Sequence, residues 1–159
     1  MRNPASSEDG ATDSGWWFPP GDPSPDDWIH WANSLPIVRA LGLKCHQVGE
    51  RSATFGLSDV PLTPNPNGAV NGGLVVSAAD QVMGVLAARV APPGYLPVTA
   101  ALHTQFHSPA LVPLTLSGQV IGGGRRLSFV DVLVTDVHGN RCAMSHGTMT
   151  ATAPAHQAS

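Results

Sequence analysis

Apolar residues dominate one continuous stretch near the middle of the chain, residues 72–90, which reads GGLVVSAADQVMGVLAARV. Apolar side chains fall on almost every side of a helix drawn through this stretch. A helix without a polar face has no side to present to water, so we expect it to be buried. About 20 residues would be long enough to span a bilayer, but Asp80, Gln81 and Arg89 interrupt the run. The pattern therefore predicts the central core helix of a small soluble domain.

Alternating apolar and polar residues predict strands on both sides of this helix. Before it, two short runs at 43–49 and 52–57 read as a hairpin. After it come four longer runs: 98–108, 114–121, 127–137 and 141–152. Their connections are of hairpin length, so we expect these four strands to be antiparallel and sequentially adjacent. An antiparallel sheet needs cover on one face, which predicts an α+β fold with a curved antiparallel sheet wrapped around one long central helix.

The first 27 residues differ in composition from the rest of the chain. They are rich in Pro, Gly, Ser and Asp, which predicts an unstructured or loosely packed N-terminal tail. Trp16-Trp17-Phe18 interrupts the polar tail. These aromatics would either anchor the tail on the domain or on a neighbouring subunit, or cover an acyl pocket as a lid. We expect the folded domain to span residues 28–152 and residues 153–159 to form a C-terminal tail.

Composition narrows the functional classes. The chain has 159 residues, of which 42% are hydrophobic and 12% charged, which favours a homo-oligomer. Six of the eleven acidic residues lie in the tail, so the remainder is faintly basic and compatible with an anionic small ligand. It lacks the basic stripe that nucleic acid requires. The two cysteines form no C-x-x-C pair and the N-terminus has no apolar signal segment; we expect a cytoplasmic protein with no membrane contact.

The start of the central helix carries the first candidate chemistry. Asn71 suits the N-cap position, and Gly72 and Gly73 leave the first amides open to a ligand. A free amide there can polarise a carbonyl through its hydrogen bond and the helix dipole. Asp80, the carboxylate of this helix, can activate water or attack directly. The alternative is a structural role: close helix packing at the glycines and a buried carboxylate at Asp80 that fixes a dimer register.

The spacing of these groups adds a geometric constraint. Gly72 and Asp80 are eight residues apart, about 12 Å along a helix axis. The two groups of one chain therefore cannot contact one reacting carbonyl. An antiparallel partner would bring Asp80 of one chain opposite Gly72 of the other, so the site requires a dimer if both groups are catalytic. Gln81 points about 100° away from its neighbour on the helix and is predicted to lie in the dimer interface.

Residues 40–152 resemble a known family, whose pattern is an Asn, a Gly, a His-Gly-Gly triplet and an acid nine positions after the His. The chain matches this pattern at Asn65, Gly68, Gly72, Gly73, Asp80, Thr99, the Ser108-Pro109-Ala110 turn and the Gly147-Thr148 pair. The resemblance is to the phenylacetyl-CoA and 4-hydroxybenzoyl-CoA thioesterase branch of the hotdog-fold acyl-CoA thioesterases. Asn71 stands where the family has His, and an Asn can neither carry a charge nor shuttle a proton.

The resemblance implies hydrolysis of the thioester of an aromatic or a short- or medium-chain acyl-CoA, with coenzyme A as part of the substrate and no cofactor. Asp80 would be the nucleophile or the general base, and Gly72 the oxyanion donor. Asn65 would contact the thioester oxygen, and Thr99 would position water. A turn role for Asn65 and a purely structural role for Thr99 are the alternatives.

Other residues would bind the substrate. Asn71 and Gly73 lie beside the oxyanion donor, and Arg125 and Arg126 could meet the phosphates of coenzyme A or form an exposed charged hairpin. The resemblance also implies a homodimer with paired sites, assembled as a dimer of dimers.

Two further functional classes remain as hypotheses. Asn71 in place of His is compatible with a non-catalytic hotdog protein that binds acyl-CoA or an aromatic ligand. A hotdog dehydratase or hydratase would pair a His with an acid, and no matching His motif is present.

A metal site is not predicted. His103 and His107 are expected on one strand face with Thr99 and Gln105. Four residues of strand separate the two histidines by about 13 Å, too far for one ion. His103 could also stand near the site in place of the missing His, although a solvated or interface position fits it better.

Overall fold

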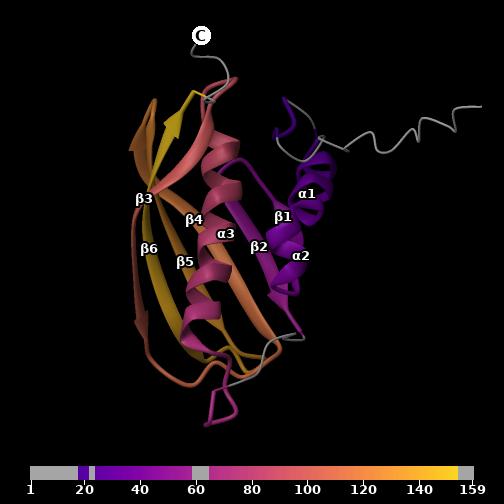
Figure 1. Ribbon diagram of the computed structural model, residues 1–159, viewed down its shortest axis with the longest axis vertical. Helices are drawn as coiled ribbons and strands as arrows, with labels where there is room; N and C mark the ends of the chain where they lie inside the picture. The colour runs from indigo at the N-terminus through magenta and orange to yellow at the C-terminus, as the bar shows by residue number, and fades with distance from the viewer. Residues whose placement is uncertain (1–17, 22–23, 59–64, 154–159) are drawn as a thin grey trace, which may run out of the picture.

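The computed structural model describes residues 18–21, 24–58 and 65–153 (Figure 1). Trp16 and Trp17 lie outside this part, and Phe18 is exposed. In chain order, the elements are α1 (Pro25–Ser34), α2 (Pro36–Ala40), β1 (Leu43–Val48), β2 (Ser52–Leu57), α3 (Gly72–Val90), β3 (Leu96–Phe106), β4 (Leu114–Gly124), β5 (Leu127–Thr135) and β6 (Arg141–Thr152). The central helix, the first hairpin and the final strand are confirmed, and α1 begins three residues before the predicted domain boundary.

The six strands form one antiparallel sheet in the order β1-β2-β4-β5-β6-β3. The prediction that the last four strands are sequentially adjacent is therefore wrong for β3, which pairs with β6 instead of β4. The reason is α3, which crosses the concave face of the sheet and delivers the chain to the far edge (Figure 1). The chain then returns, and β4 pairs with β2.

The sheet curls around α3, as Figure 1 shows. Two glycines on the inner face allow this close approach: a Cβ on Gly118 would lie 2.6 Å from Val82, and one on Gly147 would overlap Met83. Val82 and Met83 are fully buried. By length and apolar composition α3 could cross a bilayer, but here it packs as the core helix of the sheet.

One side of α3 is not covered, which corrects the expectation of burial all round. Gly73 is exposed, and Ser77, Asp80, Gln81 and Gly84 are partly exposed. These positions recur at helical spacing and form one stripe along the helix. Within the described chain, α3 therefore presents a narrow, mostly small and polar strip, in which Asp80 is the sole carboxylate.

The two edges of the sheet differ. The β1 edge is covered by α1, because the Asn33 side chain donates to the Cys45 carbonyl at 3.0 Å and accepts from the Cys45 amide at 2.9 Å. The other edge, β3, has no neighbouring strand within the described residues. Val98 and Phe106 on β3 are about half exposed. A long unpaired edge strand with apolar side chains is a template for pairing with another chain.

The hairpin between β4 and β5 turns later than predicted. Gly122, Gly123 and Gly124 belong to β4 rather than to a break, and Arg125 and Arg126 form the tip. Gly123 has a φ of +132°, and a Cβ there would overlap the backbone of the facing strand. A glycine is therefore required at this position to bring the two strands together.

Candidate active site

Asp80 lies at the middle of α3, where β3 holds its carboxylate. The Thr99 hydroxyl donates to Asp80 Oδ1 at 2.7 Å, and Gln81 Nε2 lies 3.5 Å from Asp80 Oδ2. The first contact is a short charge-assisted hydrogen bond, and the second is at the limit of one. Oδ2 therefore remains available to a ligand. The Gln81 side chain reaches back to this oxygen from the next position on the helix, and its place in a dimer interface stays a prediction.

A bulge in β3 brings Thr99 to this position. The β3–β6 register shifts between Thr99 and Ala101, so the side chains on the two sides of Ala100 do not follow simple alternation. Thr99 faces α3, whereas His103 pairs with His146 on the opposite face of the sheet. The prediction that Thr99 and His103 share a face is therefore wrong, because one extra residue reverses the direction of every side chain beyond it.

The start of α3 supplies one free amide. Asn71 is the N-cap, and its Oδ1 accepts from the Gly73 amide at 2.8 Å. The Leu74 and Val75 amides donate to the Asn71 carbonyl. The Gly72 amide makes no hydrogen bond within the described part of the chain. Of the two glycines considered as oxyanion donors, the structure thus leaves Gly72 unoccupied and uses Gly73 for capping.

Asn65 lines the same pocket as Gly72. This pocket has a volume of about 390 Å³, and its wall includes Phe106 and Ser108. The Asn65 Oδ1 accepts from the Asn67 and Ala69 amides at 3.0 and 3.2 Å. Its oxygen is thereby fixed in the loop, and the two N–H groups of its carboxamide are left to donate elsewhere. Asn65 is both a turn residue and a potential donor in the pocket, so the two sequence-based interpretations are compatible.

Phe106 was not among the predicted site residues. A Cβ on Gly72 would lie 3.2 Å from the Phe106 ring, so the ring packs on the first residue of α3. The ring is about half exposed and lines the pocket. Its inward direction follows from the bulge in β3, which the sequence pattern did not indicate.

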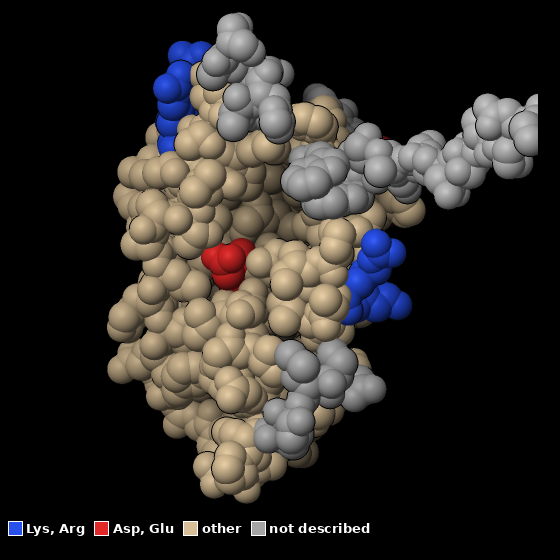
Figure 2. All heavy atoms as spheres, in the orientation of Figure 1, with Lys and Arg blue, Asp and Glu red and all other residues tan. Residues whose placement is uncertain are grey.

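Within one chain the candidate residues form two separate groups. Gly72 and Asn65 share the pocket at the start of α3, whereas Asp80 and Thr99 contact each other eight residues further along the helix. In the view of Figure 2, acidic side chains form one patch, which lies in a hollow at the height of the middle of α3. The structure therefore does not bring donor and carboxylate together in a single chain, as the helix geometry requires.

The predicted phosphate-binding residues lie at the tip of the β4–β5 hairpin. Arg125 and Arg126 are both exposed. The Arg126 guanidinium donates to the Tyr95 hydroxyl at 2.6 Å and lies 4.8 Å from the centre of the Tyr95 ring. Arg126 is thus oriented by an aromatic side chain, whereas the Arg125 side chain makes no hydrogen bond or ion pair with the described residues. Tyr95, the one tyrosine of the chain, is a further residue near this tip that the sequence did not single out.

Comparison with known proteins finds one matching family model and many similar structures. Residues 67–143 match the sequence model described as the thioesterase superfamily. No curated protein matches the chain significantly.

Several solved structures share the fold. A thioesterase from Haemophilus influenzae, HI1161, is 17% identical and superposes with a TM-score of 0.73 over 83% of this chain and 92% of that chain. The PaaI protein of the E. coli phenylacetic acid degradation operon is 18% identical, with a TM-score of 0.69 over 81% and 96%. Smu.793 from Streptococcus mutans, solved with acetyl CoA bound, is 21% identical, with a TM-score of 0.63 over 70% and 89%. The described chain therefore has the hotdog fold of these structures, and its residues 67–143 are similar to the thioesterase superfamily.

Proposed function

We propose that the protein is an acyl-CoA thioesterase whose active site forms between two antiparallel copies of the chain. The observation that carries this proposal is the unoccupied Gly72 amide at the start of α3. It lies in one pocket with the free carboxamide N–H groups of Asn65. Two such donors are suited to stabilise the oxyanion that develops during acyl transfer. The superfamily match and the acetyl CoA bound to the Streptococcus mutans neighbour support an acyl-CoA substrate.

The reaction follows from the groups on the two chains. Gly72 and Asn65 of one chain polarise the thioester carbonyl, and Asp80 of the other chain either removes a proton from the attacking water or attacks the carbonyl itself. The tetrahedral intermediate then expels the thiolate of coenzyme A. If Asp80 itself attacked, water hydrolyses the resulting anhydride between the acyl group and Asp80. Either route consumes one water and gives a free acid and a thiol. Thr99 holds Asp80 Oδ1, so Oδ2 is the oxygen directed to this task.

The free edge of β3 and the partly exposed strip of α3 give the dimer a physical basis. Pairing two β3 strands would satisfy the backbone groups of both edges and cover Val98, which is 48% exposed. The two α3 helices would then run side by side and antiparallel. Such a pair places Asp80 of one chain near Gly72 of the other. A dimer of dimers and a cytoplasmic location remain part of the proposal.

Mixed dimers test the composite site directly. Gly72→Pro removes the amide hydrogen, and proline is favoured at the first position of a helix. Asp80→Asn removes the base or nucleophile. Each variant alone should be inactive, whereas a mixture refolded together should regain about a quarter of wild-type activity, because half of the dimers carry one intact site of two. Without rescue in verified mixed dimers, the site is not shared between chains.

Substrate class is tested by thiol release from aromatic, short-chain and medium-chain acyl-CoAs. Asp80→Asn should lower kcat/KM by at least about a hundredfold, the scale of losing a general base. Asp131→Asn is the matched control, because Asp131 lies on the other face of the sheet from α3. Near wild-type turnover by Asp80→Asn would refute the assignment.

A non-catalytic acyl-CoA-binding protein is the second candidate. It is favoured by Asn71, whose side-chain oxygen is engaged in the helix cap and which offers no titratable group. This hypothesis predicts saturable binding of acyl-CoA without turnover of any member of the panel. Activity that appears only in Asn71→His would support it over the enzyme.

A further inference from the structure

The outer face of the sheet, turned away from α3, carries two neighbouring imidazoles. His103 of β3 and His146 of β6 are direct partners in the antiparallel register, and their rings stack with centroids 6.5 Å apart and 20° between their planes. Residues on either side of His146, Ser145 and Gly147, are buried toward the helix. His146 therefore projects outward, and 53% of its side chain is exposed.

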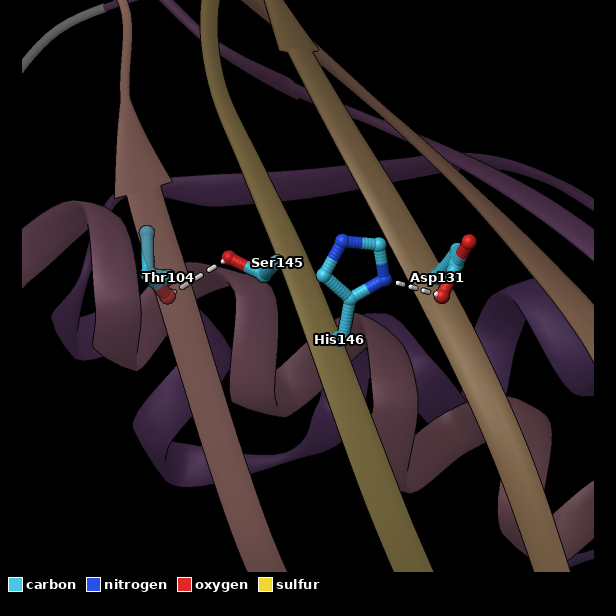
Figure 3. A network of polar contacts seen from close by, with 4 residues as sticks. All are labelled: Thr104, Asp131, Ser145 and His146. Atoms are coloured by element: carbon cyan, nitrogen blue, oxygen red, sulfur yellow. Dashed lines mark hydrogen bonds and ion pairs between the residues drawn. The ribbon is translucent and has the colours of Figure 1, made fainter.

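A carboxylate on the next strand fixes the orientation of His146. Its Nδ1 lies 2.7 Å from Asp131 Oδ1, and these two residues are partners in the β5–β6 register. Figure 3 shows the imidazole of His146 facing the Asp131 carboxylate. Because a carboxylate only accepts, Nδ1 of the neutral imidazole carries the hydrogen and Nε2 keeps its lone pair. A His whose second nitrogen donates to a carboxylate is the usual arrangement of a metal ligand.

The surroundings of the pair favour a cation. The neighbouring outer-face positions, by the strand registers, are Ala101, Gln105, Phe129, Leu133, Met144 and Thr148. None of these carries a positive charge, and Asp131 supplies a negative one. The local field is therefore neutral to negative, in contrast to the arginines at the hairpin tip.

We propose that His103 and His146 form a two-imidazole site for a late first-row divalent cation, with Asp131 orienting His146. Directly opposed residues on antiparallel strands have Cβ atoms about 4.5–5.5 Å apart. This separation allows the two Nε2 atoms to approach to roughly 3 Å, as adjacent ligands at metal–nitrogen distances of about 2.0 Å require. His103 is exposed, and its side chain makes no hydrogen bond to the described residues, so its ring is able to turn toward the ion.

The ligand number defines the kind of site. The described residues contain no group of three or more His, Cys, Asp or Glu side chains placed to hold a metal ion. Water would fill the remaining positions, so this is an exchangeable site rather than a structural centre. Divalent copper should bind most tightly, ahead of nickel and zinc. His103 and His107, the pair considered from the sequence, lie on one strand. The fold instead supplies the second ligand, His146, from the neighbouring strand β6.

This site is tested by titrating the metal-free, tag-free full chain with Cu²⁺, followed by calorimetry and electron paramagnetic resonance. We expect saturable binding of one Cu²⁺ per chain with two nitrogen ligands. His103→Gln and His146→Gln should each weaken binding at least about tenfold, and Asp131→Asn should weaken it about tenfold through loss of ligand orientation. His138→Gln, at an exposed turn on the same molecule, should leave binding unchanged.

Two outcomes overturn the proposal: no saturable Cu²⁺ binding by the wild type, or binding by both His103→Gln and His146→Gln as tight as by His138→Gln. Circular dichroism of each variant establishes that it is folded. The measurement does not depend on thioesterase activity, so it stands apart from the proposed function.

Discussion

Thr99 donates its hydroxyl to the Asp80 carboxylate across the interface between β3 and α3, at 2.7 Å. The contact joins an edge strand to the central helix, and it exists because the β3 register shifts by one residue between Thr99 and Ala101. Thr99, which positions the Asp80 carboxylate, is therefore placed by the bulge in β3. The same hydrogen bond occupies Asp80 Oδ1 and leaves Oδ2 outside this contact.

Thr99→Val tests this positioning role. Valine keeps the shape but removes the donor, and a hydrogen bond to a charged group contributes about 1.5–3 kcal/mol. Because the bond orients Asp80 for attack in the proposed reaction, kcat should fall about tenfold or more while KM changes little. Little loss of activity would mean that the bond is made equally in the ground state and the transition state. Thr99→Ser, which keeps the hydroxyl, should retain most of the activity. Steady-state thiol release measures both constants.

Gly72→Ala and Gly72→Pro distinguish the effect of added side-chain bulk from the effect of losing the amide donor at the start of α3. Alanine keeps the amide and adds a Cβ 3.2 Å from the Phe106 ring, so a small shift of the ring should limit the loss of kcat/KM to about tenfold. Proline adds similar bulk but removes the donor, and loss of one oxyanion donor costs about 10²–10³ in kcat. Equal activity of the two variants would exclude the amide as an oxyanion donor.

Much of the fold follows from the sequence because its signals are local. The apolar run at 72–90 predicted α3, and alternation predicted the strands, since both periodicities are set by backbone geometry. The strand order did not follow, because it depends on where α3 delivers the chain. The bulge at Ala100 also gives no compositional signal, so the side of β3 that carries Thr99 and Phe106 could not be assigned.

The sequence proposed the residue types of the candidate site but could not give the contacts between them. Asp80 and the two glycines follow from the spacing on a helix. The structure adds the choice of Gly72 over Gly73, because the cap uses the Gly73 amide. The pairing of His103 with His146 needed the β3–β6 register, which joins residues more than forty positions apart.

Gly118→Ala should destabilise the domain. A Cβ at this position would lie 2.6 Å from Val82 Cγ1 and 2.8 Å from Leu86 Cδ1, both on buried side chains of α3. Overpacking a core of this kind costs about 1–3 kcal/mol. Gly124→Ala on the same strand meets nothing within 4 Å and should change the free energy of unfolding by less than about 0.5 kcal/mol. Urea denaturation of both variants makes the comparison.

The Cys45 thiol should be unreactive in the folded protein. Burial raises the pKa of Cys45 from 9.0 to about 12, against a smaller lowering by a backbone hydrogen bond with Gln47. Cys142 is also buried and free. At pH 8 we expect neither thiol to react quickly with Ellman's reagent and both to react after unfolding in guanidinium. Fast labelling of Cys45 in the native state would show that the β1 edge opens.

The same shift in Cys45 predicts an alkaline limit of stability. A raised pKa in the folded state stabilises the fold below the unfolded value of 9.0, and this contribution is lost as pH rises from 9.0 toward about 12. Cys45→Ala removes the titrating group and should lessen the decline in the free energy of unfolding between pH 8 and pH 10. The test compares how steeply the free energy of unfolding falls with pH in the wild type and in Cys45→Ala, and does not depend on the stability at one pH.

Asp136 should give a stability contribution with the opposite pH dependence. Its side chain accepts from the Asn140 side chain and from the His138 and Asn140 amides, each at 2.9 Å, and closes the β5–β6 turn. The Asn140 side-chain hydrogen bond is the main cause that lowers the pKa of Asp136 below 3.8. Because the folded pKa lies below the unfolded one, the contribution is complete above pH 3.8 and is lost as pH falls through the folded value. The wild type should therefore be more stable than Asp136→Asn at pH 6, and the difference should shrink below pH 3.8. A difference that stays constant from pH 6 to pH 3 would show that the charge of Asp136 does not stabilise the turn.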